Sequence, residues 1–193
     1  MIARIILAAA ALFLLAFLAS PDSFAGLFLP LTKNGAPPIY TQTGLLSLTL
    51  SHLWLVGLAV AASTLVAVGL GVLVTRPAGR EFLPLARTIT SVGQTFPPVA
   101  VLALAVPAMG FGAGPTLVAL FLYGLLPIFE NTLTALSTLP PSVVEAARGM
   151  GLTRRQRLFQ VELPLALPVI LAGVRLSAVI ALATATIGST VAA

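Results

Sequence analysis

Few side chains in this chain of 193 residues could carry out nucleophilic, acid–base or metal chemistry. His52 is the single histidine, cysteine is absent, and a Ser/His/Asp triad would need the distant Asp22. Without cysteine or a second histidine, a zinc site built from these ligands is not available. Trp54 follows closely, and because tryptophan is typical of membrane interfaces we interpret His52 as an interfacial histidine. We predict no catalytic residue, no metal site and no cofactor.

The glycine-rich segment from Gly110 to Gly114 is the stretch that could be compared with a phosphate-binding loop. It lacks the Gly-Lys-Ser/Thr sequence whose lysine contacts the phosphates in such loops. Lys33, the sole lysine of the chain, lies far from it in the sequence. If the function of this protein requires ATP, a separate subunit must hydrolyse it.

The composition places the chain in a membrane. Hydrophobic residues make up 59% of it, charged residues only 8%, and the mean hydropathy is +1.10. A soluble domain has about 25% charged residues. Only helical bundles and closed barrels satisfy all their backbone hydrogen bonds in lipid, and long continuous apolar stretches favour helices. We predict an all-α, polytopic transmembrane helical bundle.

The positions of the basic residues predict how the chain lies in the membrane. Ten lysines and arginines stand against five acidic residues, which gives a net charge of +5. Most of the arginines fall in two clusters between apolar stretches: Arg76, Arg80 and Arg87, and then Arg148, Arg154, Arg155 and Arg157. Such clusters mark cytoplasmic loops. No basic face is interleaved with aromatic residues, so the expected partner is the lipid bilayer and not nucleic acid.

A helix needs about 20 apolar residues to cross the bilayer, and about five stretches serve as candidates. They lie at residues 5–19, extendable to Met1, within 45–74, and near 89–109, 116–136 and 165–187. Residues 1–44 are expected to form an amino-terminal helix, or alternatively a cleaved signal-like segment, followed by an extracytoplasmic loop with little regular structure. Residues 45–193 form the transmembrane domain, with basic cytoplasmic loops at 75–87 and 139–164.

The loop at 139–164 contains signals for two short helices. Two prolines end the fourth span, and Ser142 with Glu145 has the S-x-x-E spacing of a capping box. The helix that begins there should end at Gly149 or Gly151, because glycine readily adopts the left-handed conformation at helix ends.

The second helix of this loop has its own signals. Thr153 and Gln156 repeat the capping pattern, and we expect the helix to end before Pro164. The loop should therefore consist of two short helices joined by a glycine elbow and projecting into the cytoplasm.

The loop sequence EAARGMGLTRRQRLFQVELP resembles the signature loop of the permease subunits of bacterial ABC importers. The matching positions are Glu145, Ala146, Ala147, Gly151, Val161, Leu163 and Pro164, with valine where isoleucine is commonest. The segments GQTFPPVAVLALAVPAMGFGAGP, LYGLLPIFENTL and TATIGSTV are similar to permeases of the glycine betaine, choline and proline osmoprotectant importers. This resemblance covers the chain from about Ser47 to Ala193.

The resemblance implies a permease in the bacterial inner membrane that forms the translocation path of an ATP-driven importer. Its expected partners are cytoplasmic ABC ATPase subunits, an extracytoplasmic substrate-binding protein and a second permease subunit, identical or different. The helix with Glu145 would dock in a cleft of the ATPase, and Arg148 would either contact the ATPase or only set the orientation. Related permeases continue past the segment 184–191 into a last transmembrane helix, which we expect to be missing after Ala193.

Two charged residues lie within the predicted spans, where a charge is costly. Glu130 lies toward the cytoplasmic end of the fourth span and Arg175 lies in the fifth, and we predict that they pair. The pair could be a structural link between helices or part of the translocation path. Glu130 departs from the family, in which a basic or amide residue is commoner.

The third span contains Gln94, Thr95, Pro97 and Pro98, which should break or kink the helix. Irregular backbone at membrane depth is tolerated where it lines a cavity. These residues could line the translocation path or form a packed kink.

Three other functions stay open. The chain could import another small solute, such as an amino acid or another quaternary amine, or it could be an ion-coupled carrier or channel without an ATPase. A membrane-embedded enzyme is disfavoured by the single histidine and the lack of clustered acids. A quaternary ammonium is best held by an aromatic cage, and the predicted spans contain mostly single phenylalanines. We therefore expect substrate recognition mainly in the binding protein.

Overall fold

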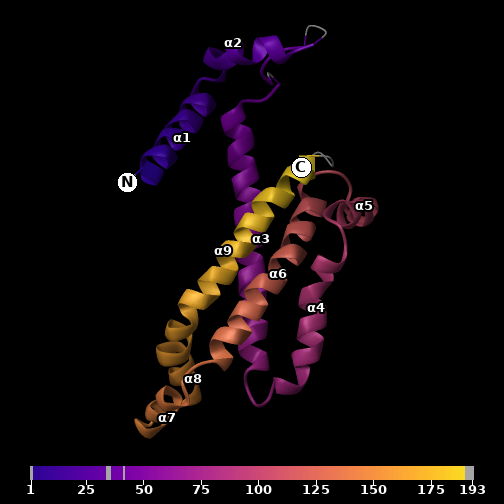
Figure 1. Ribbon diagram of the computed structural model, residues 1–193. Helices are drawn as coiled ribbons and strands as arrows, with labels where there is room; N and C mark the ends of the chain where they lie inside the picture. Colours follow the sequence, from indigo (N-terminus) through magenta and orange to yellow (C-terminus); the bar gives the residue numbers. More distant parts are fainter. Residues whose placement is uncertain (1, 34–35, 41, 190–193) are drawn as a thin grey trace. The chain divides into compact units, whose positions relative to one another are not determined.

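The computed structural model describes residues 2–33, 36–40 and 42–189, and within these ranges the chain is helical, without strands. The main helices are α1 (Ile2–Ala19), α3 (Leu45–Val74), α4 (Leu83–Thr95), α5 (Pro98–Met109), α6 (Ala113–Ser137), α7 (Pro141–Gly149), α8 (Arg154–Arg157) and α9 (Leu163–Gly188) (Figure 1). The chain divides into two compact units, Met1–Leu53 and Trp54–Ala193. The predicted all-α class is confirmed.

Four helices in the described ranges are long and apolar enough to cross a membrane. They are α1, α3, α6 and the continuous helix Arg154–Gly188, which contains α8 and α9. The bent pair of α4 and α5 would make a fifth span. The positions predicted for the first, second, fourth and fifth spans are confirmed.

The third predicted span is not one straight helix. α4 and α5 meet at a bend of 97°. Phe96 and Pro97 have extended backbone, with ψ of 144° at both, and Pro98 begins the next helix. A proline disfavours the helical conformation of the residue before it, and the expected break in the third span is confirmed. Because α4 begins at Leu83, Arg87 lies in this helix and not in the predicted loop.

The residues after α1 are more helical than predicted. Short helical turns follow one another: η1 (Pro21–Phe24), α2 (Ala25–Phe28) and η2 (Leu29–Leu31). The rings of Phe13 and Phe17 on α1 contact the ring of Phe24 edge to face, with centroids 5.4 and 5.5 Å apart. These contacts hold the turns against α1, and the expectation of little regular structure is wrong as far as Leu31.

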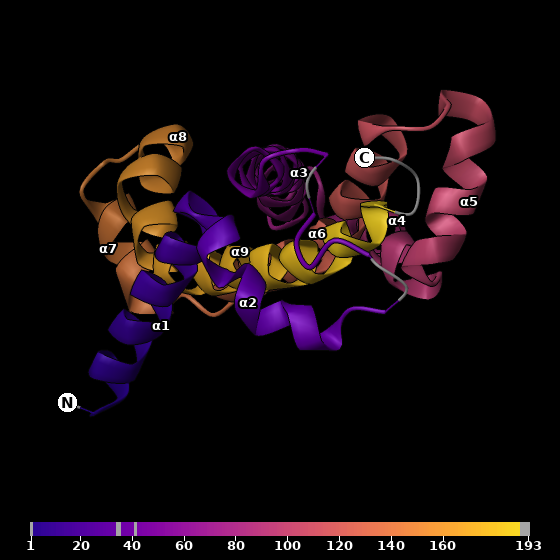
Figure 2. The ribbon, with the colours of Figure 1, turned by 90° about the horizontal axis from the view of Figure 1, so that it is seen from above.

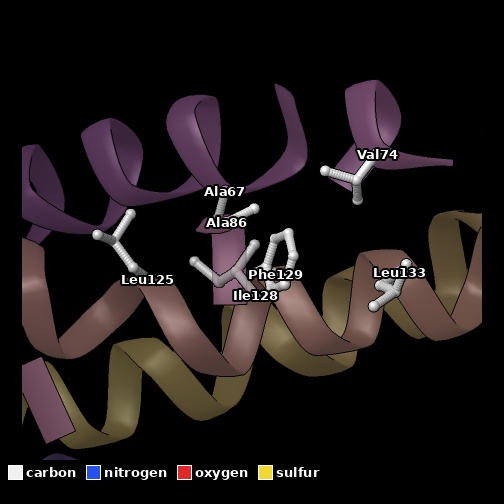
Figure 3. Close-up of a cluster of buried hydrophobic side chains, with 7 residues drawn as sticks. All are labelled: Ala67, Val74, Ala86, Leu125, Ile128, Phe129 and Leu133. Atoms are coloured by element: carbon white, nitrogen blue, oxygen red, sulfur yellow. The ribbon is translucent and has the colours of Figure 1, made fainter. Parts of the chain in front are cut away.

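α6 is the central helix of the second unit. Its residues form a buried apolar cluster with residues of α3 and α4: Ala67, Val74, Ala86, Leu125, Ile128, Phe129 and Leu133 (Figure 3). α9 packs along α6 through further clusters, one of which contains Leu136 and Ile170. Figures 1 and 2 show α7 and α8 on one side of α6 and α9, and α4 and α5 on the other.

Small residues let three of these helices approach closely. A methyl group added at Gly124 of α6 would lie 2.7 Å from the Oγ atoms of both Ser63 on α3 and Ser177 on α9. Ser63 Oγ also donates a hydrogen bond of 2.9 Å to the carbonyl of Phe121. In lipid, helices associate mainly through such close packing and interhelical hydrogen bonds.

α7 begins at Pro141 and has no side-chain cap. The predicted capping box of Ser142 and Glu145 is therefore wrong. The fixed φ of proline suits the first helical position, so the helix starts there and Ser142 already lies inside it. The predicted end is confirmed, since α7 ends at Gly149 and Gly151 adopts a φ of 77°.

The second predicted capping box is confirmed. The Oγ1 of Thr153 accepts from the amide of Gln156 at 3.3 Å, and Gln156 Oε1 accepts from the amide of Thr153 at 2.9 Å. The helix does not end before Pro164, because a π-helical turn, η4 (Leu158–Glu162), joins α8 to α9. The amide after this turn donates five residues back. We attribute the continuity to this wider turn, which relieves the usual clash of a proline ring with the carbonyl four residues earlier.

Candidate functional site

A buried carboxylate joins three segments at the end of the second unit that holds α7 and α8 (Figure 1). Glu162, the last residue of η4, exposes 5% of its surface. Its Oε2 lies 2.6 Å from Nη1 of Arg76, in the turn after α3. Its Oε1 accepts a hydrogen bond of 2.8 Å from Nε of Arg157 on α8. The cluster of Arg76, Arg157 and Glu162 thus ties α8 and the start of α9 to the end of α3.

Glu162 is the one charged residue that is buried among those the structure describes. A carboxylate away from water is stable only when it is paired and hydrogen-bonded, and here both oxygens have a guanidinium partner. Glu162 was not among the residues predicted for the site. The signal for it was a lone acidic residue directly after the arginine cluster, at the start of an apolar span, where its charge needs a basic partner.

α7 carries the first half of the predicted coupling residues. Glu145, Ala146 and Arg148 are exposed, whereas Ala147 is 1% exposed and packs inward. Of these four residues Ala147 alone packs inward, Glu145 and Ala146 leave an exposed face, and Arg148 borders a cavity beside α8. Such a face is what docking on another protein requires, and the docking itself stays a prediction.

The other predicted coupling residues lie at the elbow and after it. Gly151 is exposed, and no atom lies within 4 Å of the place where its Cβ would be, so its φ of 77° is the feature that requires glycine there. Leu163 and Pro164 are the first residues of α9, on the far side of η4. The loop sequence therefore spans both short helices and the entry into a membrane helix.

The predicted pair of Glu130 and Arg175 is wrong. Glu130 on α6 pairs with Arg87 on α4, with 3.0 Å between Nε and Oε1. α9 packs on α6 through Gly173 and Ser177, and a residue two positions away points about 200° around the helix. Arg175 is therefore exposed, and it forms no ion pair with the described residues. It borders an apolar groove of about 530 Å³ formed by Pro168, Leu171, Ala172, Leu176 and Val179.

The break between α4 and α5 is held against α6 by two hydrogen bonds. Gln94 Nε2 donates to the carbonyl of Tyr123 at 3.0 Å, and the hydroxyl of Tyr123 donates to the carbonyl of Phe96. In a regular helix the carbonyl of Tyr123 would accept a hydrogen bond from the amide four residues later. That residue is Pro127, which has no amide hydrogen. Gln94 therefore supplies a donor that α6 lacks.

Two other residues predicted at this break are exposed, whereas Pro98 is half-buried. Thr95 and Pro97 have exposed side chains, as does Gln94, and Thr95 Oγ1 donates to a carbonyl of its own helix at 2.7 Å. Both features, a broken helix and exposed polar atoms, are those expected of a segment that lines a path. That role stays a prediction.

Residues 67–193 match the protein family described as "Binding-protein-dependent transport system inner membrane component". The chain is 47% identical over 144 residues to the osmoprotectant import permease protein OsmY of Salmonella typhimurium, covering 75% of this chain and 61% of OsmY. It is 42% identical over 146 residues to the carnitine transport permease protein OpuCB of Listeria monocytogenes, covering 75% of this chain and 66% of OpuCB. It is 39% identical over 159 residues to the choline transport system permease protein OpuBB of Bacillus subtilis, covering 82% of this chain and 69% of OpuBB. The matches thus span less than two thirds of the length of the first two relatives.

Proposed function

Because the chain belongs to the predicted family, the inner membrane components of binding-protein-dependent transport systems, we propose that it is the membrane-spanning permease subunit of an ATP-driven importer. Its substrate is an osmoprotectant such as glycine betaine, choline or carnitine. Support comes from three relatives that are 39 to 47% identical to it over the aligned residues and that transport osmoprotectants, carnitine and choline. All of those relatives are transport permeases, which points away from an enzyme.

The proposed complex contains parts that this chain does not supply. ATP is hydrolysed on cytoplasmic ATPase subunits, since the chain has no phosphate-binding loop. An extracytoplasmic binding protein delivers the substrate, and a second permease subunit, identical or different, completes the path. Recognition resides mainly in the binding protein, because the ring contacts among the described residues join Phe13, Phe17, Phe24 and Phe28 to one another, and the described part of the second unit offers no aromatic cage for a quaternary ammonium.

The observation that carries the proposal is the continuity between α8 and α9. The free face of α7 docks on the ATPase, and the residues from Arg154 to Gly188 form one uninterrupted helix. A displacement of the short helices by the ATPase is therefore passed directly to α9. Through Glu162 and Arg76 the same displacement reaches α3. The geometry thus links the ATPase to two membrane helices at once.

We assign the substrate path to residues that lie in the helices of the second unit. Gln94, an exposed residue whose amide donates to the carbonyl of Tyr123, lies at the broken helix with Thr95 and Pro97 beside it. Arg175 needs a neighbour or water at its depth in the membrane. Glu130 is already neutralised by Arg87, and the pair serves as a structural link between α4 and α6.

The test is transport by the purified complex. The chain is co-expressed with the ATPase and the binding protein of an osmoprotectant importer, and ATP-driven uptake of labelled glycine betaine, choline, carnitine and proline is measured in proteoliposomes. We expect the ATPase to co-purify and uptake of at least one quaternary ammonium to require ATP. Uptake by the chain without any ATPase would instead show an ion-coupled carrier or channel, and uptake of proline alone would refute the quaternary ammonium class.

A further inference from the structure

We propose that the second unit binds the headgroup of an anionic phospholipid in a cavity between α7, α8 and the turn after α3. The cavity measures about 570 Å³. Five arginines line it together with Glu162: Arg76, Arg148, Arg154, Arg155 and Arg157. The groove beside Arg175, by comparison, has that arginine as its single charged lining residue.

The charges of this cavity are not balanced. Glu162 is already engaged by Arg76 and Arg157. Arg148, Arg154 and Arg155 form no ion pair with any residue that the structure describes. Guanidinium groups are the side chains best suited to hold phosphate oxygens, because each presents several donors in a fixed plane. Three unpaired guanidinium groups around one hollow therefore favour a ligand with an anionic phosphate.

The position of the cavity and its apolar lining favour a lipid over a soluble phosphate. Thr75 follows the last residue of α3, and Leu136 is next to the last residue of α6, so the cavity opens at the level where two membrane helices end. Leu136, Leu139 and Leu158 add apolar walls. Basic pockets beside transmembrane helices on the cytoplasmic side are suited to anionic lipid headgroups. A glycerol backbone and the first acyl carbons can lie against the leucines while the phosphate meets the arginines.

The experiment measures lipid retention by the full chain, purified and transferred to nanodiscs of phosphatidylcholine with a small fraction of phosphatidylglycerol. The test variant is the double substitution Arg154→Gln and Arg155→Gln, which removes two of the unpaired charges and keeps the capping residues on either side. The matched control is Arg4→Gln with Arg80→Gln, an equal loss of charge at two exposed arginines that do not line the cavity. Bound lipid is counted by native mass spectrometry, and inorganic phosphate is titrated as a competitor.

We expect the wild type and the control to retain phosphatidylglycerol in preference to phosphatidylcholine, and the test variant to bind it about tenfold more weakly or worse. Equal retention by the test variant, or equal loss in the control, would overturn the proposal. Displacement by millimolar phosphate would overturn the choice of a lipid. In a parallel sample co-purified with the ATPase, a test variant that loses the ATPase and keeps its lipid would overturn the proposal and assign these arginines to the ATPase contact. Because retention needs neither transport nor ATP, its failure is distinguishable from failure of the proposed function.

Discussion

Arg76, in the turn after α3, and Glu162, at the end of η4, form an ion pair of 2.6 Å that joins two segments far apart in the sequence. Arg157 approaches the other oxygen of the same carboxylate at 2.8 Å. One side chain therefore connects the loop that carries the predicted ATPase contact to two membrane helices. We consider this buried carboxylate, and not Glu145 on α7, to be the residue that holds the loop in place.

Replacing Glu162 by glutamine should uncouple the loop from the membrane helices. The substitution keeps the shape of the side chain and leaves Arg76 and Arg157 without a counter-charge. The side chains of these arginines are 28% and 11% exposed, so part of the penalty is screened. We expect a loss of about 2 kcal/mol in the free energy of unfolding and a larger loss of ATP-driven uptake.

Unfolding is followed in detergent by chemical denaturation, and uptake is normalised to the amount of protein inserted. Glu81→Gln is the matched control, because Glu81 is exposed and forms no ion pair with the described residues. If Glu162→Gln behaves like Glu81→Gln in both measurements, the carboxylate does not hold the loop.

The bond from Gln94 to the carbonyl of Tyr123 can be tested by restoring the amide that α6 lacks. Gln94→Leu should leave this carbonyl unpaired and lower stability by about 1 to 2 kcal/mol. In the Gln94→Leu background, Pro127→Ala should recover part of that loss, because alanine returns the amide four residues after Tyr123.

The measurement is a double-mutant cycle of thermal unfolding in detergent, read as the coupling between positions 94 and 127. If Pro127→Ala raises stability only in the Gln94→Leu background, the hydrogen bond from Gln94 to the carbonyl of Tyr123 is supported. If Pro127→Ala changes stability equally in both backgrounds, the glutamine does not act through this carbonyl.

The ion pair of Arg87 and Glu130 should behave as a structural link. Its side chains are 53% and 38% exposed, so the stability change on losing the pair should be within about 1 kcal/mol. Arg87→Gln and Glu130→Gln should each lower uptake by leaving one charge unpaired, and the double variant should recover uptake because both charges are gone. A double variant that is as inactive as either single one would show that a charge at this place acts on the substrate.

The spans and the second capping box could be predicted because they depend on local sequence. α3 follows the apolar run from Leu45 to Val74, and Thr153 with Gln156 caps α8 through bonds between near neighbours. The first capping box failed for an equally local reason, since Pro141 offers a better start than Ser142. Pro97 and Pro98 predicted a break in the third span, but they did not predict the angle between α4 and α5.

The partners of charged residues could not be predicted, because they depend on which helix faces lie together. Glu130 meets Arg87 only when α4 lies beside α6, and Arg175 misses Glu130 because Gly173 and Ser177 occupy the face of α9 toward α6. Glu162 contacts Arg76 only because the turn after α3 lies beside the loop in the folded chain. The sequence indicates at most that Glu162 needs a basic partner, and it does not identify which arginine meets which carboxylate.

The most direct test of the account concerns the glycine elbow. Gly151 has a φ of 77°, where a β-branched side chain is strained, whereas Gly149 ends a regular helix with open space around its Cβ position. Gly151→Val and Gly149→Val are compared for ATP-driven uptake of labelled glycine betaine in proteoliposomes, with membrane insertion and ATPase co-purification measured on the same samples. We predict that Gly151→Val inserts normally but loses the ATPase and uptake, while Gly149→Val keeps both. Normal uptake by Gly151→Val would contradict the claim that this loop couples the membrane helices to ATP hydrolysis.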